Sequence, residues 1–136
     1  MKPEQFVKTI YLGDRAVKKI EIDGWNKTVK IQVDEISRIR DSSGHWECYN
    51  DENITDGYMV FENVSSFTMN PQGYLPNDWI DIISVIEYEK IFEFTISVGH
   101  AGIIDGKDKC VEITLSIKAE QFYLEDPKKP DVKICE

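Results

Sequence analysis

Strict alternation of apolar and polar side chains is the feature that most constrains how this chain can fold. It is clearest where Val111, Ile113, Leu115 and Ile117 alternate with Glu112, Thr114, Ser116 and Lys118. A period of two places successive side chains on opposite faces of a strand, so that one face is buried and the other meets water. The pattern predicts a half-buried strand, which is typical of antiparallel sheets.

The same period recurs in two other parts of the chain. Ile20 and Ile22 alternate with charged residues, and a similar run over 29–33 follows the turn-forming segment Asp23–Asn26, which predicts a hairpin. Residues 83–98 contain no good turn residue, so they predict one long bent strand or a hairpin pivoting near Glu89-Lys90. The apolar residues of this part that share one parity, and so one expected face, are Ile82, Ile86, Tyr88, Phe92, Phe94, Ile96 and Val98.

Shorter strands and the segments between them follow from composition. Residues 45–49 predict a short strand after a turn at 41–44, and 58–61 with 64–69 predict two strands or one bulged strand. The segment 70–78 contains two prolines and a glycine, which predicts a loop. The glycines of 99–108 predict a second irregular connection.

The two ends differ from the centre of the chain. Pro3 and the helical spacing of the apolar residues that follow predict a short helix over 3–12, with Gly13 as its C-terminal cap. The β core spans 17–125, and 127–136 form a tail or an edge strand. At 136 residues the chain suits one domain over 1–136. The expected fold is mainly β: an antiparallel β-sandwich or a partly closed barrel with one short N-terminal helix.

The charge narrows the class of partner. Sixteen basic and 25 acidic residues give a net charge of −9, which repels nucleic-acid backbones and anionic membranes and favours a basic protein. The chain starts with polar residues and contains no apolar run of membrane-spanning length. Its three cysteines are odd in number and widely spaced, which argues against a disulfide framework and is typical of a reducing compartment. We therefore expect a cytoplasmic protein, and the sequence leaves its oligomeric state undetermined.

No catalytic constellation is recognisable. Residues 102–107 carry a Gly-rich segment with a lysine, but only three residues separate the glycines, and Asp108 stands where a phosphate-binding loop needs Ser or Thr. His45 and Cys48 fall on opposite faces of their predicted strand. His100, in the expected 99–108 connection, has no partner in sequence. The sequence predicts a non-enzyme without a cofactor.

Aspartates in predicted turns offer an alternative. Asp51, Asn53, Thr55 and Glu62 fall at the spacing of a calcium-binding helix-loop-helix, but Asp56 occupies the position that requires glycine. Aspartate favours turns anyway, because it hydrogen-bonds to its own backbone. The aspartates in predicted turns are Asp23, Asp51, Asp56, Asp105 and Asp108. They keep open a small-ligand or calcium-binding β-sandwich as the alternative function.

The tryptophans provide the best sign of recognition. Trp25 lies in the predicted hairpin turn, and Trp79 follows Asp78 and precedes Asp81. Exposed aromatics among carboxylates suit a binding surface for a basic protein. The alternative is that Trp25 folds back over its hairpin and Trp79 plugs the end of the sandwich. The candidate partner-binding residues are Trp25, Asp78, Trp79 and Asp81.

A resemblance supports the binding hypothesis. Residues 57–67 (GYMVFENVSSF), Asn70-Pro71 and 75–78 (LPND) are similar in pattern to small bacterial domain families of unknown function, including ones that resemble β-rich immunity proteins found beside polymorphic toxins. These motifs carry no catalytic residues to transfer. The resemblance implies a bacterial cytosolic β domain that binds a protein. The leading hypothesis is therefore a non-catalytic, immunity-like or adaptor protein.

Overall fold

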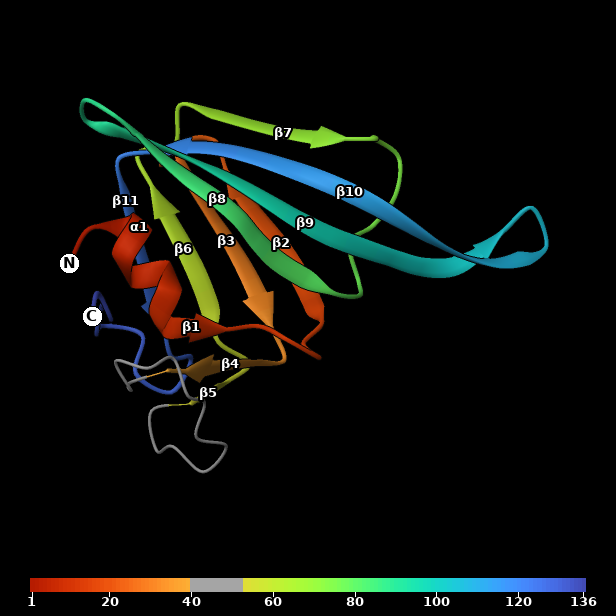
Figure 1. Ribbon diagram of the computed structural model, residues 1–136, viewed down its shortest axis with the longest axis horizontal. Coiled ribbons are helices and arrows are strands. Elements are labelled where there is room, and N and C mark those ends of the chain that lie inside the picture. Colours follow the sequence, from red (N-terminus) through yellow and green to blue (C-terminus); the bar gives the residue numbers. More distant parts are fainter. Residues whose placement is uncertain (40–52) are drawn as a thin grey trace.

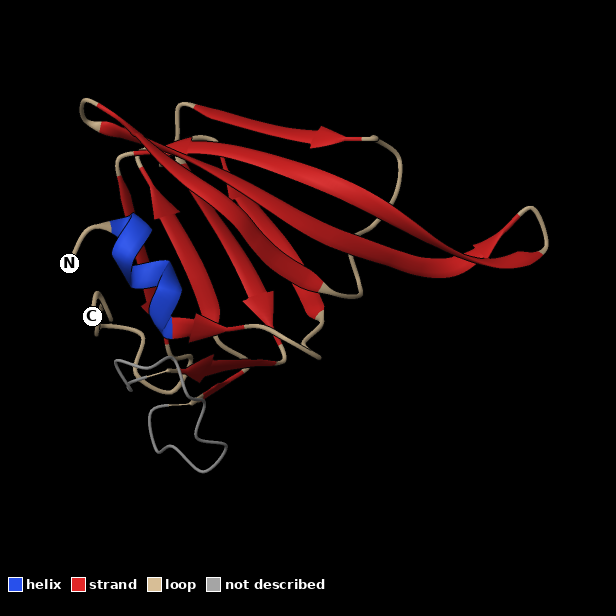
Figure 2. Cartoon of the chain, in the orientation of Figure 1, coloured by secondary structure: helices blue, strands red, loops and turns tan. Residues whose placement is uncertain are grey.

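The computed structural model describes residues 1–39 and 53–136, and strands dominate it (Figures 1 and 2). The helical elements are α1 (Pro3–Phe6) and the 3-10 turn η1 (Val7–Thr9). The strands are β1 (Ile10–Tyr11), β2 (Val17–Asp23), β3 (Thr28–Val33), β4 (Glu35–Arg38), β5 (Ile54–Thr55), β6 (Tyr58–Glu62), β7 (Ser66–Asn70), β8 (Ile80–Tyr88), β9 (Ile91–Ile104), β10 (Lys107–Ala119) and β11 (Gln121–Glu125).

Two four-stranded antiparallel sheets form the body of the fold. Their strand orders are β11-β6-β3-β2 and β7-β10-β9-β8, and a small third sheet has the order β1-β4-β5. The strands of the described ranges do not close into a barrel. The mainly β sandwich with one short N-terminal helix is therefore confirmed.

The core lies between the sheets and follows the period-two pattern. Ile113, Leu115 and Ile117 of β10 are fully buried, as predicted, while Glu112 and Thr114 are exposed. At the centre, the Phe61 ring meets the Phe94 ring edge-on, with 4.9 Å between ring centroids. The Phe122 ring lies 5.1 Å from Phe61 and 5.2 Å from Phe94. Three strands, β6, β9 and β11, therefore meet in one aromatic cluster.

Backbone contacts join the two sheets on two sides. On one side the chain itself passes from β6 to β7 and from β10 to β11. On the other, Ala16 and Trp79 form an isolated antiparallel bridge, and the Val17 N–H donates to the Asp78 carbonyl at 2.9 Å. These links hold β8 beside the start of β2, so β8 is anchored at its N-terminal end.

The predicted helix over 3–12 is too long. Helical structure ends at Thr9, and Ile10 and Tyr11 pair instead with Arg38 and Ser37 of β4. Gly13 is therefore not a helix cap. Pairing with a strand distant in sequence overrides the local helical spacing, because a short helix gains little stability from propensity alone.

The hairpin prediction at Glu89-Lys90 is confirmed, but the irregular connection over 99–108 is wrong. β9 continues to Ile104 and β10 begins at Lys107, which leaves only Asp105 and Gly106 as the turn. Both turn residues have positive φ angles, 52° and 75°, as a type I′ hairpin turn requires. This hairpin projects beyond the rest of the sandwich (Figure 1).

A β-bulge corrects the expected parity of residues 82–98. Ile82 pairs with the buried Ile96, but the register shifts before Ser84, so that Ile86 pairs with Glu93 and Tyr88 with Ile91. One extra residue moves every later side chain to the opposite face. Ile86 and Tyr88 are consequently 46% and 53% exposed, whereas the pattern placed them with the core.

The remaining predictions have mixed outcomes. The segments 58–61 and 64–69 form two separate strands, and 70–78 is largely a loop. The turn at 41–44 and the strand over 45–49 lie outside the described residues. The C-terminal tail makes one bridge, in which Leu124 and Ile134 exchange two backbone hydrogen bonds of 2.9 Å.

Side chains also hold the tail against the sandwich. The Tyr123 hydroxyl donates to Glu62 Oε1 at 2.8 Å, and Lys133 Nζ lies 3.3 Å from the same oxygen. Burial, followed by this hydrogen bond to a carboxylate, raises the pKa of Tyr123 well above its ordinary value of 10.0. Tyr123 therefore stays a neutral donor to Glu62 at physiological pH.

Candidate functional site

Three of the four edges of the two large sheets are protected against further pairing. An unprotected edge presents backbone N–H and C=O groups to any extended chain, and proteins commonly block such edges with charges, short strands or covering segments. The tail residue Ile134 covers part of β11. β2 is rich in charge, with Lys18, Lys19, Glu21 and Asp23, and β7 is only five residues long.

The fourth of these edges, that of β8, carries no charged side chain over its centre. Ile82–Ile86 is an uncharged run rich in β-branched residues, flanked by Asp81 and Glu87. Apart from its ladder with β9, β8 makes no backbone hydrogen bond to any other part of the described chain. The bulge after Ile82 is its only irregularity. β8 is therefore the edge best suited to accept another strand.

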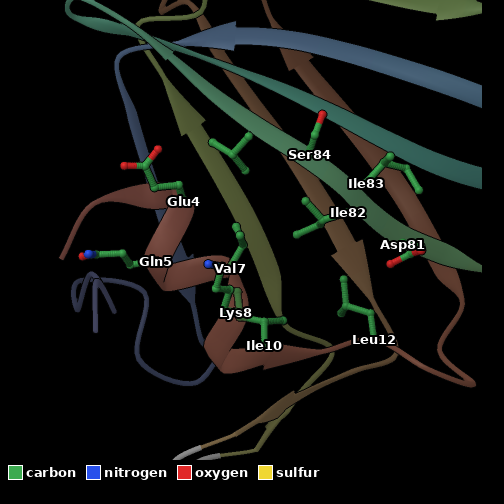
Figure 3. Close-up of a pocket in the computed structure, with 11 residues that line it drawn as sticks. Glu4, Gln5, Val7, Lys8, Ile10, Leu12, Asp81, Ile82, Ile83 and Ser84 are labelled. Atoms are coloured by element: carbon green, nitrogen blue, oxygen red, sulfur yellow. The ribbon is translucent and has the colours of Figure 1, made fainter. Parts of the chain in front are cut away.

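A groove of about 730 Å³ runs along this edge (Figure 3). One wall is a continuous stretch of β8, residues 81–85, and the other comes from α1, η1, β1 and the residue after β1. Its apolar lining residues are Val7, Ile10, Leu12, Ile82, Ile83 and Val85. The groove thus combines an unpaired strand edge with an apolar lining.

The wall of the groove that α1, η1 and β1 form, the helical wall, is anchored through one buried ring. Phe6 is 1% exposed, and its ring lies 5.7 Å from that of Phe122 in β11 and 5.3 Å from the Arg38 guanidinium. Lys2 Nζ also reaches Glu87 of β8 at 3.1 Å. That exposed ion pair contributes little stability, so Phe6 is the main anchor of the wall.

Charged groups lie on both walls. Glu4 and Lys8 belong to the helical wall and Asp81 to β8. Neither Glu4 nor Asp81 forms an ion pair with another described residue. Because Lys2 contacts Glu87 at the far end of β8, Glu4 lies toward that end, whereas Asp81 lies at the beginning of the strand. One unpaired carboxylate therefore stands near each end of the groove.

The structure separates the predicted partner-binding residues. Trp25 is 93% exposed in the β2–β3 turn, whereas Trp79 pairs with Ala16, just before β2 begins. The eight residues between Ala16 and Trp25, most of them in β2, span roughly 25 Å in extended chain. The two tryptophans do not form one surface, and only Asp81 of the four predicted residues lines the groove.

Trp79 and Asp78 have structural contacts. The Trp79 ring lies over Gly99, and its Nε1 donates to the Ser97 hydroxyl at 3.3 Å. Asp78 joins β8 to β2 through its backbone carbonyl, which accepts from Val17. Trp79 is partly buried, as in the alternative that placed it at the end of the sandwich.

Gly99→Ala should be destabilising, because any side chain at Gly99 would overlap the Trp79 ring. Overpacking of this kind costs about 1–3 kcal/mol, and we expect that loss in the free energy of unfolding by urea titration. The Trp79 indole N–H resonance should shift as its bond to Ser97 breaks. Gly24→Ala is the matched control, since nothing lies within 4 Å of a side chain there. Equal stability of the two variants would contradict the packing described.

The residues that sequence reasoning missed lie on β8 and on the helical wall. Ile83, Ile86 and Tyr88 are exposed, and Ile86 and Tyr88 were expected in the core. A usable signal was the run without charge between Asp81 and Glu87, since a solvent-facing edge strand normally carries a blocking charge. No sequence pattern indicated that Glu4 and Val7 line the groove, because their position depends on where α1 packs.

Two aspartates of the calcium hypothesis, Asp23 and Asp56, already have partners within the chain. Asp23 Oδ1 accepts the Asn26 N–H at 3.0 Å, and this bond is the main reason why the pKa of Asp23 is lowered. Asp56 Oδ1 lies 2.8 Å from Lys18 Nζ. Asp51 lies outside the described residues. Within those that are described, no three His, Cys, Asp or Glu side chains gather to hold a metal ion.

The histidine and cysteine candidates do not meet in the described structure. His100 pairs with Val111 and Ala101 with Cys110, so the His100 and Cys110 side chains lie on opposite faces of the hairpin. His100 Nδ1 lies 2.7 Å from the Leu75 carbonyl. His45 and Cys48 fall outside the described residues.

A second cavity, of about 450 Å³, lies between β2 and the loop after β7. It is lined by Lys18, Lys19, Ile20, Ile22, Met69, Tyr74, Leu75, Pro76 and Asn77. Both lysines are already paired, Lys18 with Asp56 and Lys19 with Glu21, and the Glu21 hydrogen bond raises the pKa of Lys19. The cavity is mainly apolar and has no unpaired charge.

Comparison with known proteins yields one match. A family model described as a family of unknown function (DUF6258) covers residues 1–136. No curated protein and no solved structure matches the chain. In the described ranges, the helices are too short to cross a membrane.

Proposed function

The chain belongs to the DUF6258 family, and we propose that it is a non-catalytic protein-binding domain that captures an extended segment of its partner as an added strand on β8. The observation that carries this proposal is the unpaired, uncharged edge of β8 facing the 730 Å³ groove. In strand addition, backbone hydrogen bonds provide affinity and alternate side-chain pockets provide specificity.

The dimensions of the groove support this mode of binding. Neighbouring strands lie about 4.8 Å apart, and α1 itself packs against β8, so an added strand would lie beside β8 where η1 and β1 form the opposite wall. Every second side chain of that strand would face the apolar lining formed by Val7, Ile10 and Ile82. Burial of aliphatic side chains there supplies the hydrophobic part of the binding energy.

The biological role follows from the same interaction. An immunity-like protein would occlude a partner by holding one of its segments, and an adaptor would tether that segment. A basic partner suits both roles, because the net charge of −9 favours encounter with one. We propose such a role in a bacterial cytoplasm, as the resemblance of residues 57–67 to immunity-related domains implies.

Ile83→Lys should abolish capture of extended peptides. Ile83 is 58% exposed, so the fold should tolerate lysine, but a charge at the centre of the edge would have to be desolvated on strand addition. We expect peptides selected against the wild-type protein from a random library to lose at least about tenfold in affinity. Ile103→Lys, at a still more exposed position near the tip of the β9–β10 hairpin, should bind as the wild type does.

Amide hydrogen exchange tests the same proposal by location. Bound peptide should slow exchange of β8 amides that face the groove, because they gain hydrogen-bond acceptors. Selected peptides that protect another surface, or that bind Ile83→Lys unchanged, would contradict strand addition at β8.

The second candidate function is binding of a small apolar ligand in the 450 Å³ cavity. Its volume falls in the usual range for ligand sites, and its lining is mainly aliphatic and aromatic. A ligand specific for the folded state must raise the melting temperature. A neutral apolar fluorophore that raises the melting temperature of the wild type, but not of Ile20→Asp, would favour this function. Calcium added in parallel tests the calcium-binding alternative.

A further inference from the structure

We infer that the occupant of the α1–β8 groove is a segment of another protein with a short uncharged, β-branched centre and a basic residue at each end. This inference rests on the proposed strand addition and specifies the chemistry of the partner. Its basis is the position of the charges around the uncharged run of β8, and each of the following steps concerns one part of that arrangement.

The centre of the groove excludes charge on the incoming strand. Ile82–Ile86 offers five residues without a charged side chain, and the apolar residues Val7 and Ile10 face them from the opposite wall. A charged side chain placed there would lose its hydration without gaining a partner, except near Lys8. Uncharged residues that favour extended structure, such as Val, Ile and Thr, fit this centre.

The ends of the groove attract positive charge. Asp81 marks the beginning of the uncharged run, and Glu4 stands on the helical wall toward its other end. Figure 3 shows Glu4 and Asp81 on opposite walls. Both carboxylates lack an ionic partner within the described chain, so a lysine or arginine at either end of the bound strand would supply one.

The same charges disfavour a second copy of this chain as the occupant. Antiparallel self-pairing that buries the whole run Ile82–Ile86 must centre on Ser84, and that register sets Asp81 of each copy opposite Glu87 of the other. Like charges directly opposite each other destabilise paired strands. Two copies, each with a net charge of −9, also repel at long range.

Paired synthetic peptides test this inference. Both carry the same uncharged Val/Ile/Thr centre, one with lysine at each end and the other with glutamate. Fluorescence anisotropy should show the lysine-flanked peptide binding at least about tenfold more tightly, with a preference that shrinks at high salt. Asp81→Lys should remove or reverse the preference, whereas Asp105→Lys, a control at the distant hairpin turn, should keep it.

These measurements distinguish failure of the charge inference from failure of strand addition itself. If both peptides protect β8 amides from exchange with equal affinity, strand addition stands and the charge inference is overturned. If neither peptide protects β8, the proposed function fails as well. Sedimentation equilibrium should show a monomer without peptide; self-association that Ile83→Lys abolishes would identify a second copy as the occupant and overturn the inference.

Discussion

Phe61→Ala is expected to lower the free energy of unfolding by about 4 kcal/mol, as for other large-to-small changes of buried aromatic residues. Phe61 is fully buried, and its ring contacts Phe94 of β9 and Phe122 of β11. The change would leave a cavity that two sheets line and that neither can fill alone. Since small domains are stable by only about 5–15 kcal/mol, the variant should lose a large part of its stability.

Chemical denaturation followed by circular dichroism measures this loss directly. Tyr88→Ala is the matched control, because Tyr88 is an aromatic residue of the same chain that is 53% exposed. Exposed substitutions usually change stability by less than about 0.5 kcal/mol. A loss for Phe61→Ala no larger than that for Tyr88→Ala would mean that the sheets do not pack around this ring.

Phe6→Ala should have the second-largest effect, about 3 kcal/mol, and should also detach the helical wall of the groove. Phe6 is buried against Phe122 and Arg38, and α1 is too short to persist without that contact. Peptide capture at β8 should weaken, because the wall contributed by Val7 and Glu4 would no longer be held in place.

The measurement combines denaturation with amide exchange. Amides of 4–9 should exchange faster in Phe6→Ala, while those of β9 and β10 keep their protection under conditions where the variant stays folded. Gln5→Ala, at an exposed position of the same helix, should leave both stability and exchange unchanged. Unchanged exchange of 4–9 in Phe6→Ala would show that something else anchors the helix.

Local patterns predicted the buried face well in β10 and β3, but not in β2, where Ile22 of the predicted apolar face is 61% exposed. The alternation of β10 and β3 indicated both the strand and its buried face, because the side-chain period of a strand is two. The hairpin turn after Asp23 followed from turn chemistry, whereas the hairpin at Glu89-Lys90 was one of two alternatives that the pattern left open. These predictions needed no knowledge of the neighbouring strands.

The errors occur where tertiary contacts override local signals. The glycines of 99–108 predicted a loop, but Gly99 is a strand residue whose missing side chain leaves room for Trp79. The bulge after Ile82 reversed the faces of Ile86 and Tyr88. Of the four predicted partner-binding residues, Asp81 alone lines the groove, and it was chosen for its proximity to Trp79 in sequence.

The sequence alone determined that this chain forms antiparallel strands with an aliphatic interior and a strongly acidic exterior, because alternation and charge are properties of neighbouring residues. Only the tertiary structure decided which edge stays unpaired and what lies beside it. The groove exists because Phe6 holds α1 against Phe122 and because the Ala16–Trp79 bridge ties the start of β8 to β2. Both contacts join segments far apart in the chain, so no local pattern encodes the cavity between them.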